Sequence, residues 1–352
     1  MVRIAIIAIT RNGARLGTRL RDGLGNADLH VLKKYAGQAG KGAATFDGEL
    51  GALLARLWPE YGGFVCIMAT GIVVRLVAPL LESKERDPAV VVVDDAGRFA
   101  ISLLSGHLGG GNLLAERTAS VIGARAVITT ATDSNELPSF DMIAQAEGWE
   151  IDDISRVKSL NACLLDNEEV AIVDPTDRLR FHLQGKATIS VHDALIGALR
   201  SSAKGVVLVS SRLVPPQFQN DRMLVVRPKS LYLGIGCNRG TTTDEIGAVV
   251  ASLLKRQFLS IKSVAAIGTA EAKREEAGLI EFAGQNQIPL RCYSSEELNE
   301  VAVPSPVSQH AMDAIGAQGV AEPAALLASG GGELIQPKFK SGNVTVAIAE
   351  RT

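Results

Sequence analysis

Residues 89–95 of the chain read AVVVVDD, and this short run decides the fold class. Four consecutive valines leave no polar face, which is typical of a strand in a parallel sheet covered on both sides. Two earlier runs have the same character, RIAIIAIT at 3–10 and GFVCIMA at 63–69. Helical patterns lie between and after them, at residues 48–61 and 111–124. This alternation predicts an α/β fold with mainly parallel sheets flanked by helices.

The chain is too long for one ordinary core, so we expect several units along its 352 residues. Strand signals are shorter in the middle part, and a new strand, glycine turn and helix begin near Ser230. The first unit opens in the same way, with its first helix expected near Leu16–Leu24. The chain should close with a β-hairpin that turns at 341–343. The predicted units are an N-terminal α/β domain at 1–140, a smaller middle α/β domain at 141–227 and a C-terminal α/β domain at 228–352.

Composition and charge narrow the class of protein. Hydrophobic residues make up 47% of the chain and the formal net charge is -2, which favours an ordered globular protein with no nucleic-acid partner. The longest apolar segment, 64–81, is interrupted by Arg75 and Pro79, so we expect no membrane span. The four cysteines lack C-x-x-C spacing, which predicts reduced thiols, a cytoplasmic location and no zinc site.

The run SLLSGHLGGGN at 102–112 directly follows the valine strand and its hairpin-like continuation. His107 could act as a general acid or base, and Ser105 as a hydroxyl donor or a nucleophile that His107 activates. The small residues would let backbone amides approach a ligand beside the next helix. The same residues are equally consistent with an ordinary loop, in which the glycines allow a tight turn and have no functional role. The run matches neither a P-loop, a G-x-S-x-G elbow nor a dinucleotide fingerprint. Its expected ligand contacts are Gly106, Gly109, Gly110 and Asn112.

Other polar residues follow predicted strands, where ligands bind in parallel sheets. Thr70 and Gly71 end one strand, and Arg75 could bind an anion or be a solvated helix residue. Asp94 could assist a histidine, although DDAG at 94–97 is also an ordinary hairpin turn, which we favour. Asp133 lies in another polar segment that directly follows a predicted strand.

The turn GIGCNRGTTTDEI at 234–246 predicts a second ligand contact. Its glycines permit close backbone approach, Arg239 offers a fork-shaped donor for carboxylates, and threonines crowd a helix start. Cys237 is better explained as a packed thiol than as a nucleophile. The expected contacts are Gly234, Gly236, Asn238, Arg239 and Thr241.

Taken together, these motifs resemble the CbiG family, the cobalt-precorrin-5A hydrolases of anaerobic cobalamin biosynthesis. The third unit also resembles CobE, a separate small protein. The resemblance spans essentially the whole chain and rests on the segments MATGIVVR (68–75), DPAVVVVDDAGRFAISLLSGHLGGGN (87–112), TDSNELPSFD (132–141), LGIGCNRGTT (233–242) and VAEPAALLAS (320–329).

The resemblance implies that water opens the δ-lactone of a cobalt corrinoid precursor and that acetaldehyde is released. Such a reaction requires a base, an acid and donors for an oxyanion. His107 is the expected acid or base, oriented by Asp133 or Asp94, and the amides at 109–111 would form the oxyanion site. Attack by Ser105 ranks below attack by water. The substrate carries its own cobalt, so neither a cofactor nor a protein metal site is expected.

A non-catalytic tetrapyrrole carrier of the same pathway is the main alternative, and a nucleotide-binding enzyme is a weaker one. The expected partner is the small-molecule substrate cobalt-precorrin-5A. A homodimer and transient contact with neighbouring pathway enzymes remain open.

Overall fold

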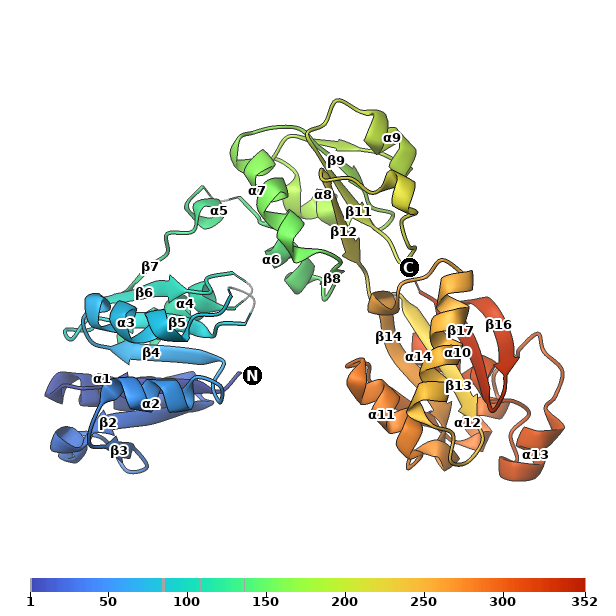
Figure 1. Ribbon diagram of the computed structural model, residues 1–352, viewed down its shortest axis with the longest axis horizontal. Helices are drawn as coiled ribbons and strands as arrows, with labels where there is room; N and C mark the ends of the chain where they lie inside the picture. The colour runs from blue at the N-terminus through green and yellow to red at the C-terminus, as the bar shows by residue number, and fades with distance from the viewer. Residues whose placement is uncertain (1, 84–85, 108, 136, 352) are drawn as a thin grey trace. The chain divides into compact units, whose positions relative to one another are not determined.

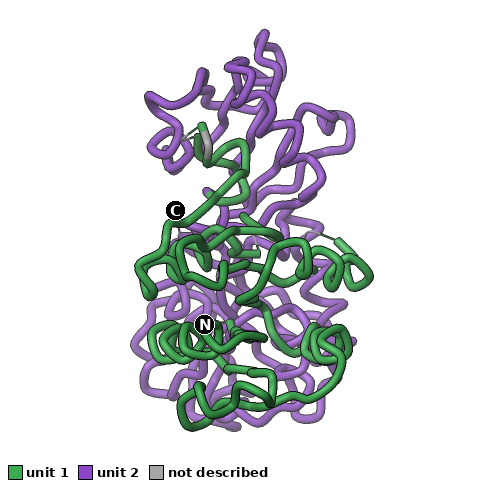
Figure 2. Tube along the Cα trace, turned by 90° about the vertical axis from the view of Figure 1, so that its left-hand side faces the viewer, with its two compact units in different colours: residues 1–142 green, residues 143–352 purple. Residues whose placement is uncertain are grey.

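The structure is a computed structural model that describes residues 2–83, 86–107, 109–135 and 137–351. It has two compact units, residues 1–142 and 143–352 (Figure 2). Three sheets form among the described residues, one in the first unit and two in the second (Figure 1). The first and middle sheets are parallel except for one pairing each, and the third has two parallel and two antiparallel pairings. Parallel pairing therefore dominates and helices flank the sheets, so the predicted α/β class is confirmed.

The first sheet has the strand order β3-β2-β1-β4-β5-β6-β7. Neighbouring strands are parallel except β5 and β6, which pair antiparallel. The strands are β1 (Ile4–Ala8), β2 (Ala27–Leu32), β3 (Ala44–Phe46), β4 (Gly63–Ile67), β5 (Ala89–Val93), β6 (Phe99–Leu104) and β7 (Arg125–Val127). The helices of this unit are α1 (Arg11–Leu24), α2 (Leu50–Leu57), α3 (Thr70–Val77), α4 (Gly111–Ile122), α5 (Ala131–Ser134) and, at the unit boundary, α6 (Phe140–Ala146), with 3-10 turns η1 (Lys33–Gln38) and η2 (Ala78–Leu80).

Both faces of this sheet are buried, as the valine run predicts. Val91 and Val93 of β5 pack in one hydrophobic cluster with α1 and α4. Val90 and Val92 pack in another with α2 and α3. Alternate side chains of a strand point to opposite faces of the sheet, so an uninterrupted apolar strand packs against a layer of helices on each face.

The first helix begins earlier than expected, at Arg11. The Thr10 hydroxyl accepts a hydrogen bond from the Gly13 amide at 2.9 Å and so caps the helix. Gly13 therefore lies in the first turn of α1, where the sequence suggested a loop before the helix. A side-chain cap stabilises a helix start enough to outweigh one glycine.

The antiparallel pairing of β5 and β6 decides where the glycine-rich run lies. Val93 pairs with Ala100, and Val90 pairs with Leu104, the last residue of β6. We call the side of the sheet where β1, β4 and β5 end the carboxyl edge, and the side where they begin the amino edge. Strands β6 and β7 run the other way and end at the amino edge.

The second unit holds a middle sheet, β10-β9-β11-β12-β8, and a third sheet, β15-β14-β13-β17-β16. The strands of the middle sheet are β8 (Glu150–Ile151), β9 (Val170–Val173), β10 (Ile189–Val191), β11 (Gly205–Val209) and β12 (Met223–Arg227). Its helical segments are η3 (Ile154–Arg156), α7 (Val157–Leu165), α8 (Arg178–Leu183), α9 (Leu195–Arg200) and η4 (Pro216–Phe218).

The third sheet ends in the predicted hairpin, in which β16 and β17 pair antiparallel. Its strands are β13 (Leu231–Cys237), β14 (Val264–Ala270), β15 (Leu290–Tyr293), β16 (Glu333–Ser341) and β17 (Val344–Glu350). Its helical segments are α10 (Thr243–Arg256), η5 (Ile261–Ser263), η6 (Glu271–Lys273), α11 (Ala277–Gln285), α12 (Ser295–Asn299), α13 (Gln309–Ile315) and α14 (Ala321–Ser329). Among the described residues, we find no helix that could span a membrane.

Candidate functional site

His107 lies at the amino edge of the first sheet, in the loop between β6 and α4. The segment after β7 leaves the sheet at the same edge, because β6 and β7 are parallel neighbours. That segment carries α5, with Thr132 and Asp133. The topology thus brings together two polar loops that are 26 residues apart in sequence.

The His107 imidazole contacts a polar group at each ring nitrogen. Nε2 lies 2.8 Å from Asp133 Oδ2 and 3.1 Å from the Thr132 hydroxyl. Nδ1 lies 3.4 Å from Oδ2 of Asp141, the second residue of α6. The Asp133 side chain is 40% exposed, His107 is 21% exposed and Asp141 is 8% exposed. The three groups therefore run from the interior to the surface.

These carboxylates change the acid–base behaviour of the ring. Asp141 contributes most to raising the pKa of His107, and Asp133 raises it further, while partial burial acts in the opposite direction. An imidazolium between two carboxylates gains charge-assisted interactions that a neutral ring does not. His107 is therefore suited to donate a proton near neutral pH.

Asn112, at the start of α4, is in hydrogen-bond contact with Asp133. Its Nδ2 donates to Asp133 Oδ2 at 3.2 Å and to the Thr130 hydroxyl at 3.0 Å. Its Oδ1 accepts from the Ser102 hydroxyl at 2.7 Å. The Asn112 residue is 7% exposed. Its polar groups therefore support the Asp133 carboxylate, whereas the sequence suggested a contact with a ligand.

Glycine is required at several positions of this loop mainly because a side chain would not fit there. A Cβ on Gly106 would lie 2.7 Å from Asn112 Oδ1, and one on Gly109 would lie 2.3 Å from Ser105 Cβ. Gly110 has a φ of 80°, which glycine adopts at little cost. The amides of Gly110 and Gly111 donate to the carbonyls of His107 and Ser105. These two expected oxyanion donors are thus already used inside the loop.

The Ser105 hydroxyl is bound to a backbone carbonyl, whereas an activated nucleophile would donate to His107. Ser105 donates this hydrogen bond to the backbone carbonyl of Asp87 at 2.8 Å. Its φ of 53° places the backbone in the left-handed region, where the carbonyl accepts from Gly111. Ser105 therefore shapes the loop, and the structure does not support the serine-nucleophile alternative.

Asp94 is not a partner of His107, which corrects one of the two alternatives from the sequence. Its carboxylate accepts from the amides of Arg98 and Phe99, both at 2.7 Å, and so closes the hairpin between β5 and β6. The hairpin lies at the carboxyl edge, opposite the His107 loop. The interpretation as a turn was the better one.

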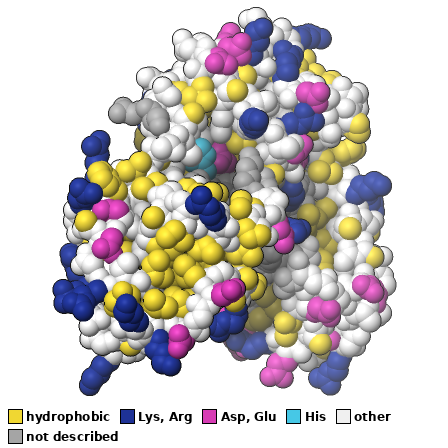
Figure 3. All heavy atoms as spheres, turned by 60° about the vertical axis from the view of Figure 1, so that its left-hand side comes forward, with side chains coloured by type: hydrophobic (Ala, Val, Ile, Leu, Met, Phe, Trp, Pro, Cys, Tyr) yellow, Lys and Arg dark blue, Asp and Glu magenta, His cyan; other side chains and the backbone are white. Residues whose placement is uncertain are grey.

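Thr70, Gly71 and Arg75 also lie at the carboxyl edge, because α3 follows the carboxyl end of β4. Arg75 is exposed, and its guanidinium donates to the Gly71 carbonyl at 2.9 Å. The outer side of α3 is otherwise apolar, with Ile72 40% and Val74 46% exposed. Figure 3 shows hydrophobic side chains gathered on the surface. The structure separates these residues from His107.

In the third sheet, Gly234 has a packing role. A Cβ there would lie 1.7 Å from the Ala321 carbonyl oxygen, because α14 crosses β13 at close range. Gly236 has no such restriction, since the nearest atom to its Cβ would be 3.5 Å away in Val320. The expected close approach at Gly234 is to a helix of the protein itself.

The turn that precedes α10 is already occupied by protein groups. The Gly240 amide donates to Glu276 Oε1 at 2.7 Å. Asn238 donates to the side chain of Asn343, and Thr241 donates to the Asn238 carbonyl, both at 2.8 Å. Arg239 is exposed. A carboxylate of the protein thus takes the position that the sequence suggested for an anionic ligand.

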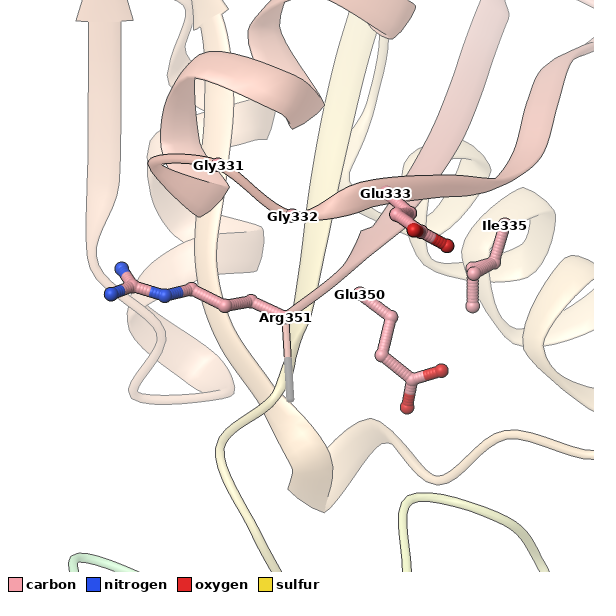
Figure 4. Close-up of a pocket in the computed structure, with 6 residues that line it drawn as sticks. All are labelled: Gly331, Gly332, Glu333, Ile335, Glu350 and Arg351. Atoms are coloured by element: carbon pink, nitrogen blue, oxygen red, sulfur yellow. The ribbon is translucent and has the colours of Figure 1, made fainter. Parts of the chain in front are cut away.

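A hollow of about 350 Å³ lies at the start of β16 and the end of β17 (Figure 4). Arg351 points away from Glu333 and Glu350 in this view. Glu350 accepts from the Ser211 hydroxyl at 2.6 Å, and Arg351 donates to the Ser329 carbonyl. These groups serve the packing of the second unit, so the His107 loop is the better candidate site. No group of three or more metal-binding side chains occurs among the described residues.

Sequence reasoning missed Asp141 as a partner of His107. Asp141 belongs to the segment 132–141, which attracted attention only through its first residues. The signal that could have found it is the carboxylate at the end of the same polar segment, eight residues after Asp133. Leu108 of the motif lies outside the described residues.

Comparisons with known proteins cover nearly the whole chain. Family profiles described as cobalamin synthesis G N-terminal, cobalamin biosynthesis central region and cobalamin synthesis G C-terminus match residues 52–133, 138–228 and 231–349. A cobalt-precorrin-5A hydrolase of Priestia megaterium is 35% identical over 98% of this chain and 94% of its own length. The protein of that name from Salmonella typhimurium is 31% identical over 98% of this chain and 97% of its own. Protein CobE of a Sinorhizobium species is 27% identical over 38% of this chain and 88% of its own.

Proposed function

This chain belongs to the CbiG family, and from that membership we propose that it is a cobalt-precorrin-5A hydrolase. Relatives of that name match it over almost its full length. The structural observation that carries the proposal is the contact between His107 and Asp133 at the amino edge of the first sheet. It supplies an acid and a base next to each other in a partly exposed loop.

The first step is hydrolysis of the lactone. Asp133 accepts a proton from water as the water oxygen attacks the lactone carbonyl carbon. The carbon–oxygen bond of the lactone breaks, and the His107 imidazolium protonates the departing oxygen. The products are a carboxylic acid and a hydroxyl group. A proton then passes from Asp133 to His107 across their hydrogen bond, which restores both groups.

The second step releases acetaldehyde. The new hydroxyl loses its proton to Asp133, and its oxygen forms the carbonyl of acetaldehyde as the carbon–carbon bond to the macrocycle breaks. The electron pair of that bond moves to the macrocycle, which takes up the proton that Asp133 accepted, so that Asp133 is again a carboxylate. The sum consumes one water and requires no oxidant or reductant. We therefore propose that the protein uses no cofactor and that the cobalt belongs to the substrate.

The proposal assigns the chemistry to the first unit. Ser105 and Asp94 are left out because their side chains are engaged elsewhere. Thr70, Gly71 and Arg75 are left out of the reacting centre because they lie at the other edge of the sheet. Arg239 is retained as an exposed cation that suits a substrate carboxylate. A cytoplasmic location is part of the proposal, since the described cysteines are free.

The test is to supply the purified full chain with cobalt-precorrin-5A and to measure acetaldehyde. We expect turnover by the wild type and a loss of about 10²- to 10⁴-fold for His107→Ala, the range for removal of a general acid or base. His310→Ala is the matched control, because His310 is exposed on α13 of the other unit. Binding of one equivalent of substrate without acetaldehyde would overturn the hydrolase and support a carrier.

A further inference from the structure

We propose that Asp141 is a positioning residue that holds His107 in the orientation and charge state required for proton transfer to the substrate. The inference rests on the proposed function and extends it to a residue that does not touch the reacting atoms. Its basis is the order of the three groups, with the buried carboxylate on Nδ1 and the exposed one on Nε2.

The burial of the two carboxylates assigns them different roles. The Asp141 side chain is 8% exposed and follows Phe140, which is 1% exposed, so it is held by the packing of α6. The Asp133 side chain is 40% exposed and can meet water or substrate. A carboxylate that is enclosed by protein is suited to fix a ring, whereas an accessible one is suited to exchange protons with a ligand.

A contact at Nδ1 controls what Nε2 can do. A histidine with one nitrogen held by a carboxylate has a defined ring orientation and a defined proton on that nitrogen. Here that contact turns Nε2 toward Asp133 and Thr132. Without Asp141, only the contacts of Nε2 with Asp133 and Thr132 would hold the ring, and its orientation during proton transfer would be less well defined.

The same contact keeps the ring protonated. The titratable groups that face His107 among the described residues are Asp133 on α5 and Asp141 on α6. Asp141 is the larger of the two causes of the raised pKa. Loss of its charge should therefore lower the pKa of His107, and the acid form should be depleted at neutral pH.

The experiment combines NMR with kinetics on the full chain. In the wild type, the nitrogen-15 spectrum of the His107 ring should show a protonated Nδ1 with a strongly downfield proton, and the ring should titrate above an ordinary histidine. Asp141→Asn should lower that pKa, reduce kcat at least tenfold and leave KM within about twofold. Asp141→Glu, which keeps the charge, should retain a raised pKa and part of kcat.

Asp47→Asn is the control, because Asp47 is a 73% exposed carboxylate of the same unit that pairs with Lys33. It should change neither the His107 titration nor kcat. An Asp141→Asn protein that keeps the wild-type His107 titration and kcat would overturn the inference. So would a wild-type spectrum without a protonated, carboxylate-bound Nδ1, a measurement that needs no variant to fold.

The two proposals fail in different ways. If the wild type releases no acetaldehyde but Asp141→Asn lowers the pKa of His107, the hydrolase proposal fails and Asp141 still positions the ring. If acetaldehyde is released and Asp141→Asn changes nothing, the hydrolase proposal stands and the role of Asp141 is lost.

Discussion

His107 Nε2 and Asp133 Oδ2 lie 2.8 Å apart at the amino edge of the first sheet. The contact exists because β6 runs against β5 and, like its parallel neighbour β7, ends at the edge opposite to the one where β1, β4 and β5 end. The Asn112 side-chain amide donates to the same oxygen of Asp133, and so does the Thr130 hydroxyl at 2.5 Å. Two loops that are separate in sequence thus form one acid–base pair.

Asp133→Asn should reduce kcat by about 10²-fold or more, because an amide cannot accept the proton of the attacking water. It should also lower the pKa of His107, since Asp133 helps to raise it. Acetaldehyde release measured against pH would check both effects. Asp94→Asn is the control: it should weaken the β5–β6 hairpin and leave kcat per folded molecule unchanged. A large loss of kcat in Asp94→Asn together with an unchanged kcat in Asp133→Asn would instead make Asp94 the partner of His107.

Ser105→Ala should leave kcat within about threefold of the wild type, because the Ser105 hydroxyl donates its proton to the Asp87 carbonyl. The loss of this hydrogen bond should cost about 1 kcal/mol of stability. Steady-state kinetics and chemical denaturation would measure the two effects. A loss of kcat comparable to that of His107→Ala would instead identify Ser105 as a nucleophile.

Gly234→Ala should destabilise the third sheet strongly, by about 3 kcal/mol or more, because its Cβ would clash with the Ala321 carbonyl. Gly236→Ala, two residues further on the same strand, should cost under about 1 kcal/mol because its Cβ meets only an ordinary contact. Thermal unfolding of both variants would measure the difference. Equal stability would mean that α14 does not cross β13 at this distance.

His30 should make the first unit sensitive to acid. Burial lowers the pKa of His30, whose Nε2 has no hydrogen-bond partner among the described residues. The unfolded state therefore binds a proton more readily, and stability should fall as pH decreases through about 6.5, the ordinary histidine value. Urea unfolding at pH 8 and pH 5 should show a smaller loss in His30→Leu than in the wild type. An equal loss in both proteins would argue against a buried neutral ring.

Much of the fold follows from local patterns that the sequence displays. The valine run predicts a strand buried on both faces, and Val90–Val93 alternate between two helical layers. The closing hairpin was also predictable, because polar turn residues at 341–343 separate two strand-like runs. The start of α1 was placed too late, because a glycine near a helix start reads as a turn until its cap is seen.

The candidate site was predictable only in part. His107 stands out because glycines surround it, and Asp133 because it follows a strand. Asp141 does not stand out, since its role depends on where α6 packs. Gly234 was predicted to approach a ligand, but it approaches α14. A glycine permits either kind of close contact, so the sequence does not distinguish them.

Hydrophobic periodicity and turn chemistry are local, so they already indicate most strands and helices and the loops that carry polar side chains. Which of those loops meet follows from how the strands pair and how the helices pack on the sheet. One antiparallel pair, β5 with β6, reverses the chain direction within a parallel sheet. That reversal places His107 beside Asp133 and Asp141, and leaves Asp94, Thr70 and Arg75 at the opposite edge. The turn at 94–97 that reverses the chain is a local pattern, whereas the pairing of β6 with β7 and the packing of α6 join segments that no local pattern connects.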